Sequence, residues 1–444
     1  MRFILAGLLA LGLASPLSAK DDVSSYTLDN GLEVVVIEDR RAPVVVHMLW
    51  YRAGAADETP GVSGVAHFLE HLLFKETENY EAGALSRIVA ENGGSDNAFT
   101  SQDYTAYFQR VASDRLGLMM EMESGRVRDL ILSEDDIATE RDVILEERAQ
   151  RTDSEPGALF REQMNAASYL NHPYGIPVIG WRHEMEQLSR EDALAFYERF
   201  YAPNNAVLVV AGDVAPEEVL ELAKTHYGPL APTHDLGKRE RVQEPPQLAE
   251  RRLRFADPRV AQPYVLRTYQ APERDSGAQE EAAALVYLAE ILGGNGATSV
   301  LGRALQFDEQ IAVYAAAGYR SVSLDDTSFT LIVVPTAEVS LKDAEAALDR
   351  EIAEFLETGI DPEQFERVKF QIRAGDVYSQ DNVMSRAERY GEALTSGLTV
   401  EDVMAWPDVL QAVTPEDVMK AARALFDDRK AVTGWLVPEG GDEM

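Results

Sequence analysis

Two histidines and one glutamate form the pattern His-x-x-Glu-His in the first part of the chain. They are His67, Glu70 and His71. If this segment is helical, the two histidines lie on one face, one turn apart, and both imidazoles can reach a single metal ion. Glu70 then lies beside His71, where its carboxylate can hold a water molecule at the metal without binding the metal itself. The pattern therefore predicts a metal site that activates water.

Most pairs of histidines four residues apart on a helix are surface pairs or satisfied core side chains. A metal is favoured here because the chain has only seven histidines, and because the whole five-residue pattern is a known catalytic signature. A buried imidazole pair beside a carboxylate also needs a partner that offsets its desolvation, and a metal ion supplies one. The helix should be mostly buried, because its other residues include Val65, Phe68, Leu69, Leu72 and Leu73.

The composition narrows the kind of site and the kind of partner. The 444 residues are enough for two or three domains, and 45% of them are hydrophobic, as in a globular protein. The formal net charge of −35 disfavours nucleic acid and anionic membranes as partners. There are no cysteines, so disulfides and thiolate sites are excluded, and any zinc must be bound by His, Asp or Glu.

Residues 1–19 have the features of a secretory signal peptide. Arg2 gives a basic start, an apolar run follows that is too short to span a bilayer, and Ala19 ends a stretch of small residues at a plausible cleavage point. No other segment is long and apolar enough to cross a membrane. We therefore expect a soluble mature protein that is periplasmic or secreted.

Local signals predict the elements that surround the motif. Asn30-Gly31 is typical of a hairpin turn, and Met119, Met120 and Met122 favour core filling over a ligand surface. The expected elements are a hairpin at 25–37, strands at 43–51, 104–108 and 206–212, and helices at 84–91, 115–127 and 188–200.

A third metal ligand is required, because two histidines leave a catalytic zinc site one protein ligand short. Ser133-x-x-Asp136 is a capping box that opens another helix. Glu140 and Glu147 on this helix are seven residues apart and therefore share a face. The pattern alone does not choose among its glutamates, because each could equally be an ordinary solvated charge.

A segment with little periodicity separates two halves of the chain. It contains Pro232, Pro245 and Pro246. We interpret residues 229–250 as a linker between a first domain at 20–228 and a second domain at 251–444.

The second half repeats the first but lacks its chemistry. The helix at 280–292 stands where the motif helix stood and has no histidine, and Val368 and Gly375 take the places of Glu140 and Glu147. One metal site per chain follows. The matching segments are 413–437 with 188–212, 326–335 with the strand beginning at Asp103, and 360–367 with the start of the helix at Ser133.

The chain resembles the pitrilysin/insulysin family of zinc peptidases, in its short branch related to the mitochondrial processing peptidase. The resemblance covers essentially the whole mature chain and rests on 67–71, on Asn97-Ala98-x-Thr100 and on 140–147. It implies an α+β fold of two homologous α/β domains, each a mixed or antiparallel sheet with helices on one side, forming half of a clamshell. It also implies site roles: His67, His71 and Glu147 bind one Zn²⁺, Glu70 is the general base, and Glu140 is a supporting acidic residue.

The resemblance further implies where a substrate binds. The family adds its peptide as an extra strand to a sheet edge beside the metal, and Asn97, Ala98 and Thr100 match that edge. Its second domain carries an Arg seven residues before a Tyr. This chain keeps Tyr314 but has Phe307 at the Arg position. We therefore expect the zinc-bearing half of a heterodimer, with a paralogous zinc-free partner supplying the Arg and Tyr, or else a homodimer.

The leading interpretation is a zinc endopeptidase or oligopeptidase acting on peptides selected by size and unfoldedness, with basic peptides favoured by the acidic charge. The alternative is a non-catalytic scaffold or assembly subunit of the same fold. Relatives of that kind usually have decayed motifs, whereas this motif is intact. A periplasmic peptide-binding protein would explain two α/β lobes but not the motif.

Overall fold

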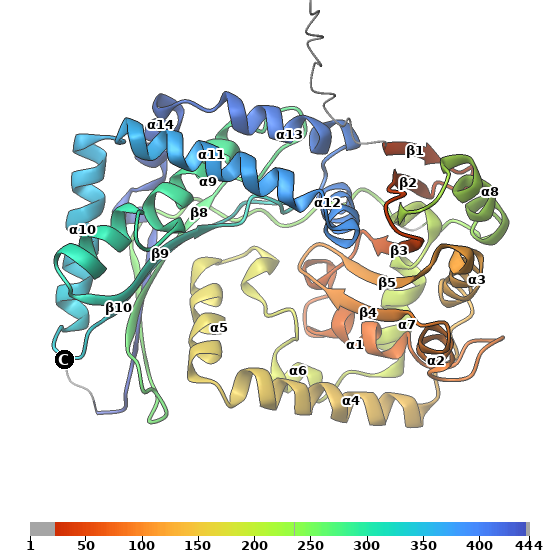
Figure 1. The fold of residues 1–444 in the computed structure, drawn as a ribbon. Helices are drawn as coiled ribbons and strands as arrows, with labels where there is room; N and C mark the ends of the chain where they lie inside the picture. Colours follow the sequence, from red (N-terminus) through yellow and green to blue (C-terminus); the bar gives the residue numbers. More distant parts are fainter. Residues whose placement is uncertain (1–22, 235, 441–444) are drawn as a thin grey trace, which may run out of the picture.

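Two mixed β-sheets, each with its own layer of helices, make up the protein (Figure 1). The structure is a computed structural model that describes residues 23–234 and 236–440. The expected signal peptide at 1–19 lies outside these residues. Within them, no helix is both long and apolar enough to cross a bilayer.

The first sheet has the strand order β1-β2-β6-β3-β5-β4. β2 and β6 are parallel, and the other neighbours are antiparallel. The expected hairpin is confirmed as β1 and β2, and β4 is an edge strand. The strands are β1 Val23–Thr27, β2 Glu33–Glu38, β3 Val44–Tyr51, β4 Ser95–Thr100, β5 Thr105–Ala112 and β6 Ala206–Gly212.

Helices of the first half, apart from α5, cover one face of this sheet. Met119, Met120 and Met122 are buried in that core, as predicted. The capping boxes at Ser133 and Ser189 are also present. The helices are α1 Val65–Leu72, α2 Ala84–Glu91, α3 Leu116–Arg126, α4 Glu134–Arg148, α5 Pro156–Ser168, α6 Arg182–Met185, α7 Arg190–Phe200 and α8 Pro216–His226.

The second sheet reproduces the strand order of the first without a counterpart of β1. Its order is β7-β11-β8-β10-β9, with β7 and β11 parallel and the other neighbours antiparallel. The strands are β7 Arg251–Ala256, β8 Tyr264–Ala271, β9 Ala312–Tyr319, β10 Thr327–Pro335 and β11 Ala431–Val437. The helices are α9 Glu280–Ala289, α10 Leu341–Thr358, α11 Pro362–Ser379, α12 Val383–Thr395, α13 Val400–Ala412 and α14 Pro415–Leu425.

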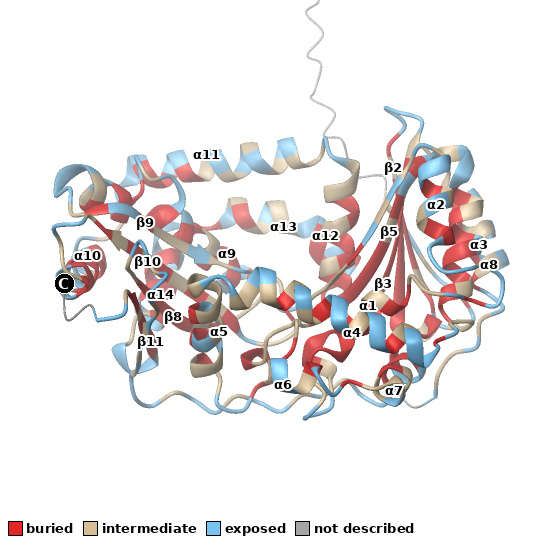
Figure 2. Cartoon of the chain, turned by 90° about the horizontal axis from the view of Figure 1, so that it is seen from below, coloured by how far each residue is buried: buried red, intermediate tan, exposed pale blue. Residues whose placement is uncertain are grey.

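Each half also lends one helix to the other half's sheet, an addition to the predicted one-sided layers. α12 packs on the second face of the first sheet, where Tyr390 and Leu394 belong to one buried apolar cluster with Trp50. α5 packs on the second sheet, where Phe160 and Met164 meet strand β11. Figure 2 shows α12 beside β3 and β5, and α5 beside β8 and β11. The exchange ties the two halves together through buried apolar surface.

Both exchanged helices pack tightly at a glycine. A Cβ on Gly391 of α12 would lie 2.0 Å from Trp50, and a Cβ on Gly434 of β11 would lie 2.3 Å from the Met164 sulfur. No side chain fits in either place without displacing an aromatic or thioether group of the other half.

We expect Gly391→Ala to destabilise the protein by about 1–3 kcal/mol, because the added methyl overpacks the contact with Trp50. Gly375→Ala is the matched control: Gly375 lies inside α11 with no neighbour within 4 Å of an added Cβ. Alanine should stabilise that position by about 0.5–1 kcal/mol through its higher helix propensity. Urea unfolding measures both. Equal effects of the two substitutions would contradict the proposed close packing.

The segment predicted to be a linker is firmly attached along part of its length. It contains no helix or strand between α8 and β7 in its described residues. Arg239 and Arg241 form ion pairs with Asp57 at 2.8 and 2.9 Å, and Arg241 also pairs with Asp103 and, at 3.1 Å, with Asp325 of the second half. These buried charges hold the segment against both halves.

Candidate metal centre

The residues of the His-x-x-Glu-His motif line a hollow of about 970 Å³ between α1, α4 and the edge strand β4. α1 contributes the motif, α4 contributes the acidic residues, and β4 contributes the predicted substrate edge. The hollow is lined by His67, Glu70, His71, Asn97, Ala98, Phe99, Thr100, Thr139, Asp142, Val143, Glu146, Glu147, Gln150 and Arg151.

Two glutamates from other segments cap the first turn of α1. The carboxylate of Glu58 accepts the backbone N–H groups of Gly64 and Ala66, both at 2.9 Å. Glu184 accepts the N–H group of Ser63 at 2.7 Å. These bonds satisfy donors that a helix start leaves free. Burial raises the pKa of Glu58 to about 8, so this side chain acts there as a hydrogen-bond acceptor.

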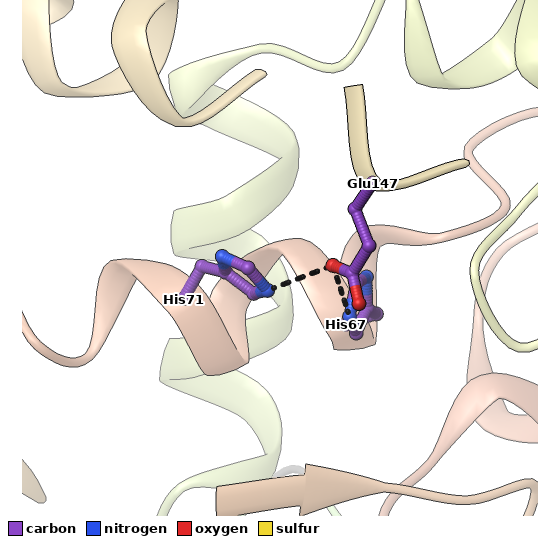
Figure 3. A group of neighbouring side chains, drawn as sticks. All are labelled: His67, His71 and Glu147. Carbon is purple, nitrogen blue, oxygen red and sulfur yellow. Dashed lines mark ion pairs between the residues drawn. The ribbon is translucent and has the colours of Figure 1, made fainter. Parts of the chain in front are cut away.

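The structure brings Glu147 to both histidines. Glu147 Oε2 lies 3.5 Å from His67 Nε2 and 3.4 Å from His71 Nε2 (Figure 3). One ligand atom from each of the three residues lies within 4.8 Å of the others. Tetrahedral zinc with bonds of about 2.0–2.2 Å separates its ligand atoms by about 3.4 Å. The donor set and its spacing therefore fit one zinc ion.

Glu140 contacts the ring nitrogen of His71 that does not face Glu147. Its Oε2 lies 3.3 Å from His71 Nδ1, and its Oε1 lies 2.6 Å from Lys75 Nζ. The hydrogen bond from His71 lowers the pKa of Glu140, so this carboxylate stays ionised. With Nδ1 protonated, Nε2 of His71 presents its lone pair toward Glu147, an arrangement that metal-binding histidines commonly use.

The two histidines differ in their support and in their pKa. Burial lowers the pKa of His67 to about 3, so its imidazole is neutral and can donate a lone pair. Burial also lowers the pKa of His71, but the hydrogen bond to Glu140 and the charges of Glu70 and Glu147 outweigh it, and the net shift is upward. Nδ1 of His67 is buried with no hydrogen-bond partner in the described part of the chain.

Glu70 is buried at the base of the hollow. Burial raises its pKa, which makes the ionised carboxylate a better proton acceptor. The hydroxyl of Thr100 donates a 2.6 Å hydrogen bond to Glu70 Oε2. Thr100, predicted as a substrate contact, therefore also orients the predicted base.

The predicted substrate residues do not all meet at this hollow. Asn97, Ala98 and Thr100 line it from β4, which pairs only with β5 among the described strands. Tyr314 lies on β9 of the second half with 51% of its surface exposed, and it is not part of the lining. Phe307, at the position expected for an Arg, is 54% exposed.

Sequence reasoning missed three contributors to this centre. Glu58 and Glu184 cap α1 from distant segments, and nothing in their local sequence signals this. Arg151 forms an ion pair with Glu147 at 2.7 Å. Its spacing of four residues from Glu147 was a usable signal, because such residues are neighbours on a helix surface.

Two family models match this chain. "Insulinase (Peptidase family M16)" matches residues 33–181, and "Peptidase M16 inactive domain" matches residues 187–372. The first match contains the motif and Glu147. The second lies mostly in the second half, where the described residues show no comparable group of metal-binding side chains.

Relatives named as zinc proteases match along nearly the whole chain. "Zinc protease PqqE" of Helicobacter pylori is 30% identical over 422 residues, which cover 93% of this chain and 92% of the relative. "Uncharacterized zinc protease Rv2782c" of Mycobacterium tuberculosis is 30% identical over 415 residues, which cover 91% of this chain and 90% of that relative. "Uncharacterized zinc protease YmxG" of Bacillus subtilis is 24% identical over 92% of this chain and 97% of that relative.

Solved structures share the fold. The crystal structure of a protease from Helicobacter pylori matches with a TM-score of 0.87 at 28% identity, over 94% of this chain and 99% of that chain. The periplasmic protease PqqL from Escherichia coli matches with a TM-score of 0.80 at 20% identity, over 94% of this chain but 48% of that one. Pitrilysin matches with a TM-score of 0.76 at 16% identity, over 96% of this chain and 46% of the pitrilysin chain. The chain thus has the fold of half a clamshell, and the family models and full-length relatives together show that it belongs to peptidase family M16.

Proposed function

We propose that this chain is a zinc-dependent endopeptidase or oligopeptidase that hydrolyses extended peptides and holds one Zn²⁺ through His67, His71 and Glu147. One observation carries the proposal: two imidazole nitrogens and a carboxylate oxygen from distant segments converge at 3.4–3.5 Å, with Glu70 in the same hollow. A zinc ion held by these residues would lower the pKa of its bound water toward neutrality and polarise the scissile carbonyl.

The protein's own groups supply the proton transfers. Glu70 takes a proton from the attacking water and passes it to the leaving amine, which requires a buried carboxylate of raised pKa in a fixed position. Burial raises the pKa of Glu70, and the hydrogen bond from Thr100 fixes one of its oxygens.

The substrate binds as an additional strand on β4. The outer edge of β4 carries no strand partner among the described residues, and Asn97, Ala98 and Thr100 lie along it inside the hollow. Main-chain hydrogen bonds give such binding little dependence on side-chain identity. This supports a preference for unfolded or short peptides.

A paralogous zinc-free subunit, or else a second copy of this chain, completes the site. Tyr314 lies outside the hollow, and Phe307 stands where the family resemblance implies an Arg. The chain also matches only 48% of PqqL and 46% of pitrilysin, so each of those chains has room for a second half. A periplasmic location is supported by the leader-like residues 1–19 and by the periplasmic relative in Escherichia coli.

Metal analysis and peptide cleavage test the proposal together. We expect about one zinc per purified chain, lost in His71→Ala, because two remaining ligands hold zinc poorly. Cleavage of a peptide library, measured for the chain alone and for its co-purified complex, should stop when a chelator removes the metal and return when zinc is added. A chain that binds no zinc, or a complex that cleaves no peptide, would contradict the proposal and favour a scaffold subunit.

A further inference from the structure

The hollow at the proposed metal centre is acidic, and one exposed arginine, Arg151, lines it. Its lining includes the carboxylates of Glu70, Asp142, Glu146 and Glu147. Arg151 is the only lysine or arginine among the lining residues that the structure describes.

Arg151 contacts the proposed ligand itself. It lies in a π-helical turn, Ala149–Asp153, that continues α4 directly. Its Nη1 is 2.7 Å from Glu147 Oε1, while Glu147 Oε2 faces the two histidines. The Glu147 side chain is 17% exposed, whereas that of Arg151 is 77% exposed. One carboxylate oxygen is thus engaged by the arginine, and the other is left for a metal.

We propose that Arg151 is a positioning residue that holds Glu147 as a one-oxygen metal ligand. This inference rests on the proposed zinc site. Carboxylates bind metals through one oxygen or through both, and a charge-assisted hydrogen bond to Oε1 favours the first mode. Lys75 plays the matching part on the other side of the site, where it pairs with the glutamate that supports His71.

An exposed ion pair between residues four apart on a helix usually contributes little to stability. The pair between Arg151 and Glu147 differs from such pairs because its carboxylate is largely buried and faces two imidazoles. Its effect should therefore appear in metal affinity and in coordination, and not in the stability of the metal-free protein.

Arg151→Ala and Arg151→Lys test the role. We expect Arg151→Ala to weaken zinc binding by about 10–100-fold in chelator competition, the range typical for outer partners of metal ligands. Arg151→Lys should recover part of this loss, since it keeps the charge but not the planar guanidinium. In the Co²⁺-substituted protein, Arg151→Ala should weaken the visible absorption as the second oxygen of Glu147 joins the metal.

Arg182→Ala is the matched control. Arg182 is also an exposed arginine, and it pairs with Asp153 of the same turn at 2.7 Å without contacting a proposed ligand. Its loss should leave zinc affinity and the Co²⁺ spectrum unchanged. If Arg151→Ala has the zinc affinity and spectrum of the wild type, the positioning role is overturned. If the wild type itself binds no zinc, the proposed function fails first.

Discussion

Glu70→Gln lowers kcat for peptide hydrolysis by about 10²–10⁴-fold while zinc content stays at the wild-type level, if Glu70 is the general base. Glutamine has nearly the same shape, and its carbonyl oxygen can still accept the hydrogen bond that Thr100 donates to Glu70. It cannot take a proton. Little bulk water reaches the Glu70 side chain itself to take over that role, because only 9% of its surface is exposed. Metal analysis and turnover on one peptide substrate measure the two quantities.

Glu146→Gln provides the control for charge. Glu146 lines the same hollow, and its carboxylate is held by the side chain of Gln150 at 2.7 Å. Its substitution removes one negative charge without touching the proposed base, so kcat should change little. Unchanged turnover in Glu70→Gln would remove Glu70 from the chemistry. Loss of zinc in that variant would instead assign it a structural role.

Local signals predicted most of the elements of the first half. The Asn30-Gly31 turn, the capping box at Ser133 and the spacing of His67 and His71 each depend on residues within one or two turns. Such patterns act before tertiary contacts form, and the structure has a hairpin and helices where they predict them. The repeat of the two halves was visible for the same reason, because it copies these short patterns.

The proposed third ligand could not be chosen from the sequence pattern alone. Glu140, Glu146 and Glu147 all lie on one acidic helix, and only a resemblance to known peptidases singled out Glu147. In the structure, Glu147 faces both histidines, Glu140 supports His71 from behind, and Glu146 bonds Gln150. These different positions follow from how α4 crosses α1, which is a long-range packing property. No spacing within α4 encodes it.

The exchange of α5 and α12 between the halves also could not be predicted from the sequence. Each helix has an apolar face, but periodicity says only that the face is buried, and not which sheet buries it. The partner surface for α12 lies around Trp50, 340 residues before Tyr390 in the chain. The buried ion pairs of Arg241 with Asp57 and Asp103 could not be predicted either. Prolines in a segment indicate a linker, but they do not show whether its charged side chains pair with distant residues.

A backbone crossing next to the candidate metal centre contacts both α1 and α4. Residues 179 and 180 pass directly over Ser63 and Gly64, at the start of α1. Gly180 has φ +92°, and a Cβ there would lie 2.4 Å from the carbonyl oxygen of Ser63. On its other side, the carbonyl oxygen of Gly180 accepts a 2.9 Å hydrogen bond from Arg148, the residue after Glu147. The crossing thus connects the start of the motif helix to the end of α4.

We expect Gly180→Ala to weaken both the fold and the metal site. A positive φ costs alanine about 1–2 kcal/mol, and the clash with backbone adds about 1–3 kcal/mol. Relief of the clash shifts the start of α1 or the segment that crosses it, and Nδ1 of His67 has no hydrogen-bond partner among the described residues that would hold its ring in place. A displacement of about 1 Å at a catalytic centre can cost about 10²-fold in rate.

Gly61→Ala separates the two causes. Gly61 has φ +97°, but no atom lies within 4 Å of an added Cβ, so only the conformational cost applies. Urea unfolding should therefore show the larger loss for Gly180→Ala, and chelator competition should show weakened zinc binding for Gly180→Ala alone. Equal behaviour of the two variants would mean that the crossing does not set the position of α1. The placement of His67 would then have to come from the apolar packing of α1 and from the caps supplied by Glu58 and Glu184.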